Sequence, residues 1–471
     1  MADNKALRSG VGYTLGNILI KGINFLTLPI FSRLLSTEEF GIYSVFASYD
    51  AILFVLIGLA LHASIQSANL EFRGKINSYT ASVSLIYILN GGILLTVAML
   101  FRQALSGLLG IPAGAVALLV LGSFSSAVVT LYNTRISLDY AYKKYLLVSA
   151  CSSVANIAVS LILIMTVFRE NRAMGRIIGS VVPLFVISLA LLLSFYRKAP
   201  ARPNRTFWKF GVGYSLPIVP HGISQVLLAQ CDRIMIKSMV SDSAAGIYSL
   251  AGNIKLVLTI ITDSIGTAWT TWFYSRMDAG DKTAIQKRSV QLLGLFFIFS
   301  TGLMALCPEL VWILGGKEYE LGKFVAIPMV LDAFILFLYN IIVPSEYYAK
   351  KTTYIMGGTM AAAVVNVVLN YIFIRRFGFI AAAYTTLAAY VFYVVLHCAI
   401  SRHLIKFFVL PLGPMLGVSL AAGALAVWNL YFANSLILRW GMCALVVIPT
   451  ALVLLRAVLR DRKTGEISKG N

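Results

Sequence analysis

The chain has 471 residues, of which 59% are hydrophobic and 12% are charged, and its formal net charge is +20. Soluble domains carry about 25% charged residues, so this composition excludes a water-soluble globular protein. It also excludes a transmembrane β-barrel, whose spans would alternate apolar and polar residues. We therefore predict an all-α polytopic membrane protein.

Apolar stretches that reach the roughly 20 residues needed to cross a bilayer predict about 14 membrane-spanning helices. The first six are expected at residues 9–31, 41–67, 77–101, 112–134, 145–168 and 174–196. Six more are expected at residues 209–236, 245–270, 289–314, 325–348, 353–374 and 377–401. A final pair is expected at residues 407–431 and 434–457. Two prolines, Pro217 and Pro220, predict a kink in the seventh helix.

Lys and Arg residues predict the orientation of these helices. With the N-terminus inside, the inner segments hold most of the 39 Lys and Arg residues, which satisfies the positive-inside rule. We expect a protein of the inner (cytoplasmic) membrane with both termini cytoplasmic. The outer loop with Arg169, Arg172 and Arg176 runs against the trend. Most of the net charge is thus a topology signal, and no nucleic-acid partner is expected.

Short motifs occur twice, in the same order, with the second copy about 200 residues after the first. The pairs are Gly10–Tyr13 and Gly211–Tyr214, Gly41–Ser44 and Gly246–Ser249, Leu131–Asn133 and Leu338–Asn340, and Lys143–Lys144 and Lys350–Lys351. Six helices per repeat is an even number, so both repeats enter the membrane in the same direction. We predict an N-lobe at residues 1–205, a C-lobe at 206–403, and a two-helix hairpin with a basic tail at 404–471.

Six charged side chains lie inside predicted spans: Lys21, Asp50, Asp232, Arg233, Lys255 and Asp263. All of them fall on the first two helices of each repeat. A charge at the centre of a lipid-facing helix costs about 2.5–3.5 kcal/mol on insertion scales. These four helices are therefore expected to meet at the lobe interface around a hydrated central cavity.

Helical spacing places further polar residues on the faces that bear these charges. Asn17 and Asn24 share a face with Lys21, and Gln225 shares one with Asp232. The predicted substrate-binding residues of the cavity are Lys21, Lys255, Asn17, Asn24, Gln225 and Arg233. The two lysines would face an anionic substrate, and Asp50, Asp263 and Asp232 would balance charge or carry a coupling ion, H⁺ or Na⁺.

The pairs Lys21–Asp50 and Lys255–Asp263 could instead be ion pairs that lock helices together, and Asp332 receives no role. Enzyme chemistry is not indicated, because the sequence has no phosphate-binding loop, no paired aspartates in a soluble loop and no Ser/His/Asp cluster. Five isolated cysteines indicate no metal site, and no cofactor is expected. Transport would then draw on an ion gradient or on the substrate gradient.

Two further stretches carry a resemblance to a known family. Asn366, Asn370 and Gly378 precede Ala381-Ala382-Ala383-Tyr384-Thr385-Thr386, and Asp232-Arg233 precedes Gly246-Ile247-Tyr248 and Ala251. With the duplicated six-helix plan and two extra helices, this pattern resembles the polysaccharide flippase branch of the multidrug/oligosaccharidyl-lipid/polysaccharide (MOP) superfamily. Ala381 replaces the usual glycine of that signature and Thr385 the usual alanine.

The resemblance implies a flippase that moves polyprenyl-pyrophosphate-linked oligosaccharides to the outer leaflet by alternating access, within the lipid bilayer. It also implies a polysaccharide polymerase and assembly proteins as further partners. A second hypothesis is an ion-coupled multidrug antiporter of the same superfamily, although its cavity would favour carboxylates over lysines. A third is a membrane polymerase or glycosyltransferase, which would need a large outer loop that the sequence lacks.

Overall fold

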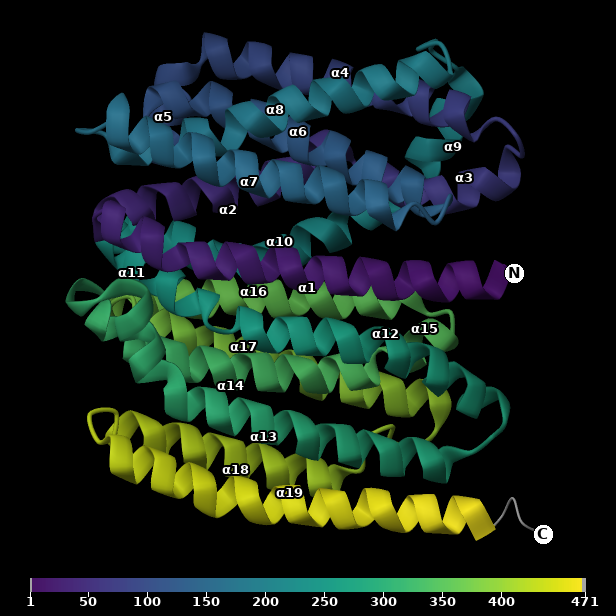
Figure 1. Ribbon diagram of the computed structural model, residues 1–471, viewed down its shortest axis with the longest axis vertical. Helices are drawn as coiled ribbons and strands as arrows, with labels where there is room; N and C mark the ends of the chain where they lie inside the picture. Colours follow the sequence, from purple (N-terminus) through teal and green to yellow (C-terminus); the bar gives the residue numbers. More distant parts are fainter. Residues whose placement is uncertain (1, 468–471) are drawn as a thin grey trace. The chain divides into compact units, whose positions relative to one another are not determined.

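The structure is a computed structural model that describes residues 2–467, with the side chains of residues 10, 12–457 and 459 (Figure 1). All regular elements of this part are helices, so the predicted fold class is confirmed. The side chains of the predicted basic tail, Arg460, Arg462, Lys463 and Lys469, lie outside the described residues.

The helices follow the predicted spans closely along most of the chain. The first ones are α1 (Ala2–Leu34), α2 (Thr37–Gly58), η1 (Leu61–Ser64), α3 (Ile65–Glu71), α4 (Ile76–Leu100), α5 (Arg102–Leu109), α6 (Ala113–Ser137), α7 (Tyr142–Thr166) and α8 (Arg172–Lys198). They are followed by α9 (Arg205–Ser215), η2 (Leu216–Ile218), α10 (Val219–Met239), α11 (Asp242–Asn253), α12 (Leu256–Asp278) and α13 (Lys282–Gly315). The last ones are η3 (Lys317–Gly322), α14 (Lys323–Ile342), α15 (Pro344–Tyr348), α16 (Thr352–Phe377), α17 (Ala381–Ile405), α18 (Leu412–Tyr431) and α19 (Leu436–Ile467).

The predicted count of about 14 spans is not confirmed. Among the described residues, 12 helices are long and apolar enough to cross a membrane, and up to 13 if the pair α11–α12, bent by 42°, forms one span. The predicted seventh span is divided into α9, η2 and α10. Its predicted kink is confirmed, because the 3₁₀ turn η2 lies at Pro217 and α10 begins beside Pro220.

The second predicted helix ends earlier than expected. It was predicted to reach residue 67, but α2 ends at Gly58, and Leu59 and Ala60 adopt positive φ angles of 45° and 51°. The Asn90 side chain on α4 donates hydrogen bonds to the carbonyl oxygens of Leu56 and Ile57, at 2.8 and 3.1 Å. These bonds satisfy carbonyl groups that the end of a helix leaves without an intrahelical donor.

Two compact units make up the chain, Met1–Ser249 and Leu250–Asn471. The helices α9 and α10, which open the predicted C-lobe, pack in the first unit against α4 and α2, respectively. The predicted segments 1–205, 206–403 and 404–471 stay a prediction.

In the first unit, α6 is the central helix and packs against α2, α4 and α8, while α7 packs on α8 and α1 packs on α7 (Figure 1). Buried apolar side chains such as Phe46, Ile57, Val116 and Leu131 fill the space between these helices. The helices of this unit therefore pack around a hydrophobic core of buried side chains.

In the second unit, α14 is the central helix and contacts α12, α13, α17 and α18. The helices α18 and α19 both pack on α13. Arg439 of α19 is buried and its Nη1 donates to Glu309 Oε2 of α13 at 2.9 Å. This ion pair fastens the last helix to the unit.

The two copies of the Gly-Ile-Tyr-Ser motif meet in the first unit. A Cβ atom at Gly41 of α2 would overlap the carbonyl oxygen of Asp242, and one at Gly246 of α11 would overlap that of Thr37. Thr37 Oγ1 and Ser243 Oγ lie 2.7 Å apart beside this crossing. Glycine thus lets the starts of two repeat-related helices approach to backbone contact.

We expect Gly246→Ala to destabilise the protein by roughly 1–3 kcal/mol, because the added methyl group overpacks this crossing. The measurement is thermal unfolding of the purified protein in detergent. Gly92→Ala on α4 is the matched control, because a Cβ there meets nothing within 4 Å. Equal stability of the two variants would contradict the close crossing.

Candidate functional site

The polar face of α1 carries three predicted cavity residues, Asn17, Lys21 and Asn24. Tyr145 of α7 donates a hydrogen bond from its Oη to Asn17 Oδ1, and its ring lies 5.0 Å from that of Tyr13. Asn17 and Asn24 are exposed, and Lys21 is partly exposed. The predicted face is thus accessible, and contacts with α7 orient its N-terminal part.

Asp50 lies on α2, where it faces α6. Ser123 Oγ donates to Asp50 Oδ1 at 2.7 Å, and the adjacent Gly122 leaves room for the carboxylate. The carboxylate is therefore held at a contact between two core helices of the first unit. This position suits a charge-balancing or ion-carrying group better than a direct contact with a bulky substrate.

Asp232 and Arg233 of α10 are both held by the second Gly-Ile-Tyr-Ser motif. Tyr248 Oη donates to Asp232 Oδ2, and Asp232 is 4% exposed. Arg233 Nε donates to Ser249 Oγ at 3.1 Å. The motif that repeats in the sequence therefore supplies the hydrogen-bond partners of these two adjacent charged residues of α10.

A second contact of Arg233 links α10 to α2. Arg233 Nη1 donates to Gln230 Oε1, and Ser48 Oγ of α2 donates to the same oxygen at 3.3 Å. Gln225 lies nearer the start of α10, where its Nε2 is 3.2 Å from His221 Nε2. The guanidinium of Arg233 thus belongs to a polar network that joins three helices.

Lys255 lies at the break between α11 and α12, at the N-cap position of α12. Its Nζ is 3.3 and 3.2 Å from Asp332 Oδ1 and Oδ2 of α14. The Asp332 side chain is 1% exposed, whereas that of Lys255 is 28% exposed. Asp332, which received no role from the sequence, is thus the buried counter-ion of the predicted cavity lysine, in place of the predicted alternative partner Asp263.

Asp263 lies two turns further along α12 and is exposed. Thr259 Oγ1 donates to the carbonyl oxygen of Lys255, and Thr267 Oγ1 donates to that of Asp263, each at 3.2 Å. These threonines satisfy their hydroxyl groups within the helix, so the polar face of α12 carries little desolvation cost. The cavity shared by Lys21 and Lys255 stays a prediction, because the two lysines belong to different units.

The structure places one partly buried cation differently from the sequence prediction. Arg176 was predicted in an outer loop, but it lies in α8, where its Nη1 contacts Asn156 Oδ1 and Ser160 Oγ at 2.5 and 2.7 Å. Its guanidinium also lies 3.9 Å from the ring centroid of Phe31 and 4.6 Å from that of Tyr43. A structural role of this residue explains why it departs from the positive-inside pattern.

The sequence also did not predict a buried pair of an acidic residue and a histidine. Glu346 of α15 and His397 of α17 are fully buried, and Glu346 Oε1 lies 2.7 Å from His397 Nδ1. Gly358 of α16 makes room for the imidazole, since a Cβ there would overlap His397 Nε2. Neither residue lies near the other in sequence, so only their packing could reveal the pair.

Comparison with known proteins identifies the family of the chain. The family model described as "Polysaccharide biosynthesis protein" matches residues 6–275. Lsg locus putative protein 1 of Haemophilus influenzae is 24% identical over 77% of this chain and 90% of its own length. The probable low-salt glycan biosynthesis flippase Agl15 of Haloferax volcanii is 19% identical over 83% of this chain and 82% of its own length.

Two solved structures share the fold. The lipid II flippase MurJ in an inward closed conformation has a TM-score of 0.72 at 15% identity and covers 95% of this chain and 99% of its own. An inward-facing MATE family multidrug resistance transporter of the MOP superfamily has a TM-score of 0.61 at 15% identity, over 84% of this chain and 94% of its own. The resemblance to a polysaccharide family that the motifs indicated is confirmed by the family model, and the fold is the one found in a MOP superfamily transporter.

We expect Lys255→Ala to lower the free energy of unfolding by roughly 1–3 kcal/mol, because it leaves the buried Asp332 carboxylate without its cation. Asp332→Asn should cost less, since the partly exposed ammonium of Lys255 keeps access to water. The double variant Lys255→Ala/Asp332→Asn should recover part of the loss. Chemical unfolding in detergent micelles measures all three, and equal losses for the two single variants would contradict this asymmetry.

Proposed function

Because the chain belongs to the polysaccharide biosynthesis protein family, we propose that it is a flippase for a polyprenyl-pyrophosphate-linked oligosaccharide. It moves this lipid from the cytoplasmic to the outer leaflet by alternating access, for the biosynthesis of O-antigen, capsule or exopolysaccharide. Two observations support the proposal: the fold is that of a lipid II flippase, and a relative over most of the chain is named as a glycan biosynthesis flippase. A polysaccharide polymerase and assembly proteins would act with it.

The observation that carries the proposed mechanism is the pairing of Lys255 with Asp332. An ammonium group at a helix break, 28% exposed and held by one buried carboxylate, is positioned to exchange that carboxylate for a phosphate. Phosphate offers more acceptor oxygens than a carboxylate, and charge-assisted hydrogen bonds to it offset its loss of hydration. Lys21 on the accessible face of α1 supplies a second cation. Asn17, Asn24 and Gln225 supply amide groups for sugar hydroxyls.

Coupling follows from the same exchange. When Lys255 turns to the substrate, the Asp332 carboxylate remains buried and needs another cation. A proton or a sodium ion, taken from the membrane gradient, neutralises it and is released when Lys255 returns. Asp50 and Asp232, which accept hydrogen bonds from the hydroxyl groups of Ser123 and Tyr248, are further candidates for this ion, and Asp263 is a fourth.

The orientation completes the proposal. Both termini lie in the cytoplasm and the protein resides in the inner membrane, in accord with the Lys and Arg distribution. Arg233, bonded to Gln230 and Ser249, positions α10 and contacts the substrate only when this network opens.

A multidrug antiporter is the second candidate, because a MATE transporter has the same fold. The paired lysine distinguishes the two functions, since a cavity for cationic drugs would present its carboxylates without a competing ammonium group. A membrane polymerase or glycosyltransferase is not proposed, because one relative is named as a glycan biosynthesis flippase and the two solved structures are a flippase and a transporter.

We expect deletion of the gene to cause accumulation of a lipid-linked glycan in the cytoplasmic leaflet. Mass spectrometry of extracted membrane lipids, together with probing of spheroplasts by a lectin, measures its amount and its side. An unchanged lipid-linked pool with reduced efflux of cationic drugs would favour the antiporter instead.

We expect Lys21→Ala to reduce surface glycan at least tenfold, since one charge-assisted hydrogen bond to phosphate contributes about 1.5–3 kcal/mol. Lys21→Arg should retain more activity, because it keeps the charge. For Lys255 the informative variant is Lys255→Ala/Asp332→Asn, which removes the cation and leaves no buried charge behind. Full export by both alanine variants, at equal amounts of protein in the membrane, would rule out the phosphate-binding role.

A further inference from the structure

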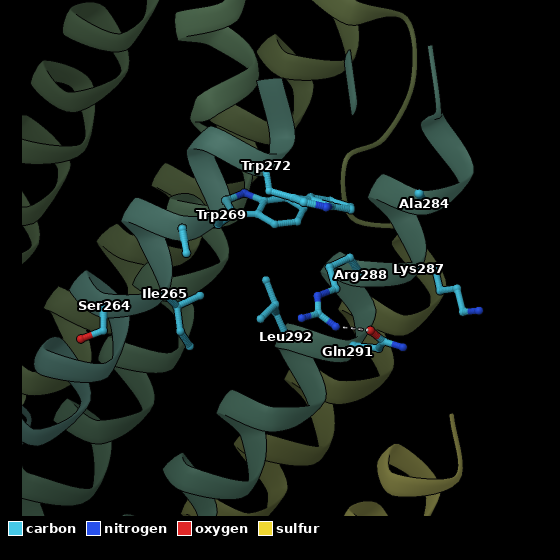
Figure 2. Close-up of a pocket in the computed structure, with 10 residues that line it drawn as sticks. Ser264, Ile265, Trp269, Trp272, Ala284, Lys287, Arg288, Gln291 and Leu292 are labelled. Carbon is cyan, nitrogen blue, oxygen red and sulfur yellow. Dashed lines mark hydrogen bonds between the residues drawn. The ribbon is translucent and has the colours of Figure 1, made fainter. Parts of the chain in front are cut away.

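A pocket of about 690 Å³ opens between α12 and α13 in the second unit. One wall consists of Ser264, Ile265 and Ala268 with the indoles of Trp269 and Trp272, all from α12 (Figure 2). The opposite wall comes from the first three turns of α13 and includes Arg288, Gln291 and Leu292. The pocket thus combines an apolar interior with a polar wall on one side.

The aromatic wall is rigid. Trp269 is 4% exposed, and its Nε1 donates to the carbonyl oxygen of Ile341 on α14 at 3.0 Å. Trp272 packs on it with ring centroids 5.5 Å apart, at an interplanar angle of 31°. Because one indole is fixed by the central helix of the unit, the pair forms a preorganised surface for an apolar chain or a sugar ring.

The polar wall presents a cation. Arg288 Nη1 donates to Gln291 Oε1 at 3.1 Å, and Figure 2 shows this guanidinium in the pocket, below the indoles, while the Lys287 side chain points away. A guanidinium has five N–H donors, so this bond leaves several donors for a ligand.

The nearest carboxylates of the α12–α13 turn are bound to other groups. Asp278 accepts from Tyr348 Oη at 2.7 Å. Asp281 accepts from the backbone N–H of Ala284 at 3.0 Å and lies 3.6 Å from Arg276. The described residues that line the pocket include no carboxylate, so its polar side attracts an anion.

We propose that this pocket binds the phosphorylated head of the lipid-linked glycan at the cytoplasmic surface, before the lipid enters the transport path. The inference rests on the proposed function, which supplies both the substrate and the orientation. In that orientation the turn between α12 and α13 is cytoplasmic, and Arg288 lies about 9 Å into α13 from its first residue. The interior of the pocket is apolar, so its occupant has an apolar chain, and the cation selects a phosphate at the head of that chain.

Three features favour the substrate lipid over bulk phospholipid. The indole pair offers a stacking surface that acyl chains do not require, the amide of Gln291 adds a hydrogen-bonding group for a hydroxyl, and the volume exceeds that of a single phosphate. The site is separate from Lys255, which lies at the other end of α12. The lipid would therefore be held here first and reach the lysines afterwards.

The test is photo-crosslinking to the full-length protein in detergent, with a benzophenone amino acid in place of Ile265. The probe is polyprenyl monophosphate, and mass spectrometry quantifies the crosslinked peptide. We expect Arg288→Ala to reduce the yield about tenfold, in line with the loss of one charge-assisted contact. Arg288→Lys should retain an intermediate yield. Lys282→Ala, the control, removes the same charge at the same end of α13 but from a side chain that lies 5.4 Å from the Phe407 ring.

Competition experiments distinguish the sources of the phosphate. With a deuterium-labelled probe, excess unlabelled polyprenyl monophosphate should abolish the labelled crosslink, whereas inorganic phosphate, dephosphorylated polyprenol and phosphatidylglycerol should leave most of it. Equal yields from Arg288→Ala and Lys282→Ala would overturn the site, and competition by phosphatidylglycerol or inorganic phosphate at matched concentration would overturn its assignment to the substrate lipid. Neither result bears on the proposed function, which depends on glycan export by the Lys21 and Lys255 variants. If Arg288→Ala unfolds in detergent, Arg288→Gln replaces it.

Discussion

A charged group inside the membrane needs a partner, and this constraint organises both units of the protein. The desolvation penalty of an ion in a low-dielectric environment is several kcal/mol even after relaxation, and a partner of opposite charge or a set of hydroxyl groups must offset it. Lys255 has Asp332, Arg439 has Glu309, and Asp232 has Tyr248. Each of these contacts joins two different helices. The charges therefore select which helices pack together, in addition to any role in transport.

The two copies of the Gly-Ile-Tyr-Ser motif make related contacts. The same Gly-Ile-Tyr-Ser sequence begins near the start of α2 and within α11, and its two glycines bring these helices into backbone contact. Its tyrosines hold charged groups in both copies: Tyr43 lies against Arg176, and Tyr248 binds Asp232. A duplicated segment has thus kept its packing role and its use of an aromatic residue beside a charge, while the charge itself differs in sign between the copies.

In the proposed mechanism, Lys255 exchanges the carboxylate of Asp332 for a phosphate of the substrate, and this exchange gives the ion pair a role in transport. Lys255 lies where α11 and α12 are separated by a 42° bend, so its neighbourhood lacks a continuous helix that would resist movement. Separating a fully buried ion pair would be costly in free energy. The Lys255 side chain is 28% exposed, so it is accessible to a ligand from outside the core. In our proposal, the pocket between α12 and α13 would use the same cation–phosphate chemistry at the other end of α12. Two cationic sites along one helix would hold a phosphorylated lipid in succession.

The sequence by itself determined the helical class and the positions of most spans, because hydropathy is a local property of the chain. Of the charges it placed inside spans, Asp232 is buried, whereas Asp263 is exposed. Two predicted boundaries were wrong. At the end of α2, the distant Asn90 side chain bonds the carbonyl groups of Leu56 and Ile57, and the predicted seventh helix is divided at the local residues Pro217 and Pro220. The partners of the charges were decided only by tertiary structure. Asp332 is 77 residues from Lys255, and Glu346 is 51 residues from His397. Helix periodicity shows which residues share a face, but it contains no information about which other face lies opposite, and that depends on how the helices pack.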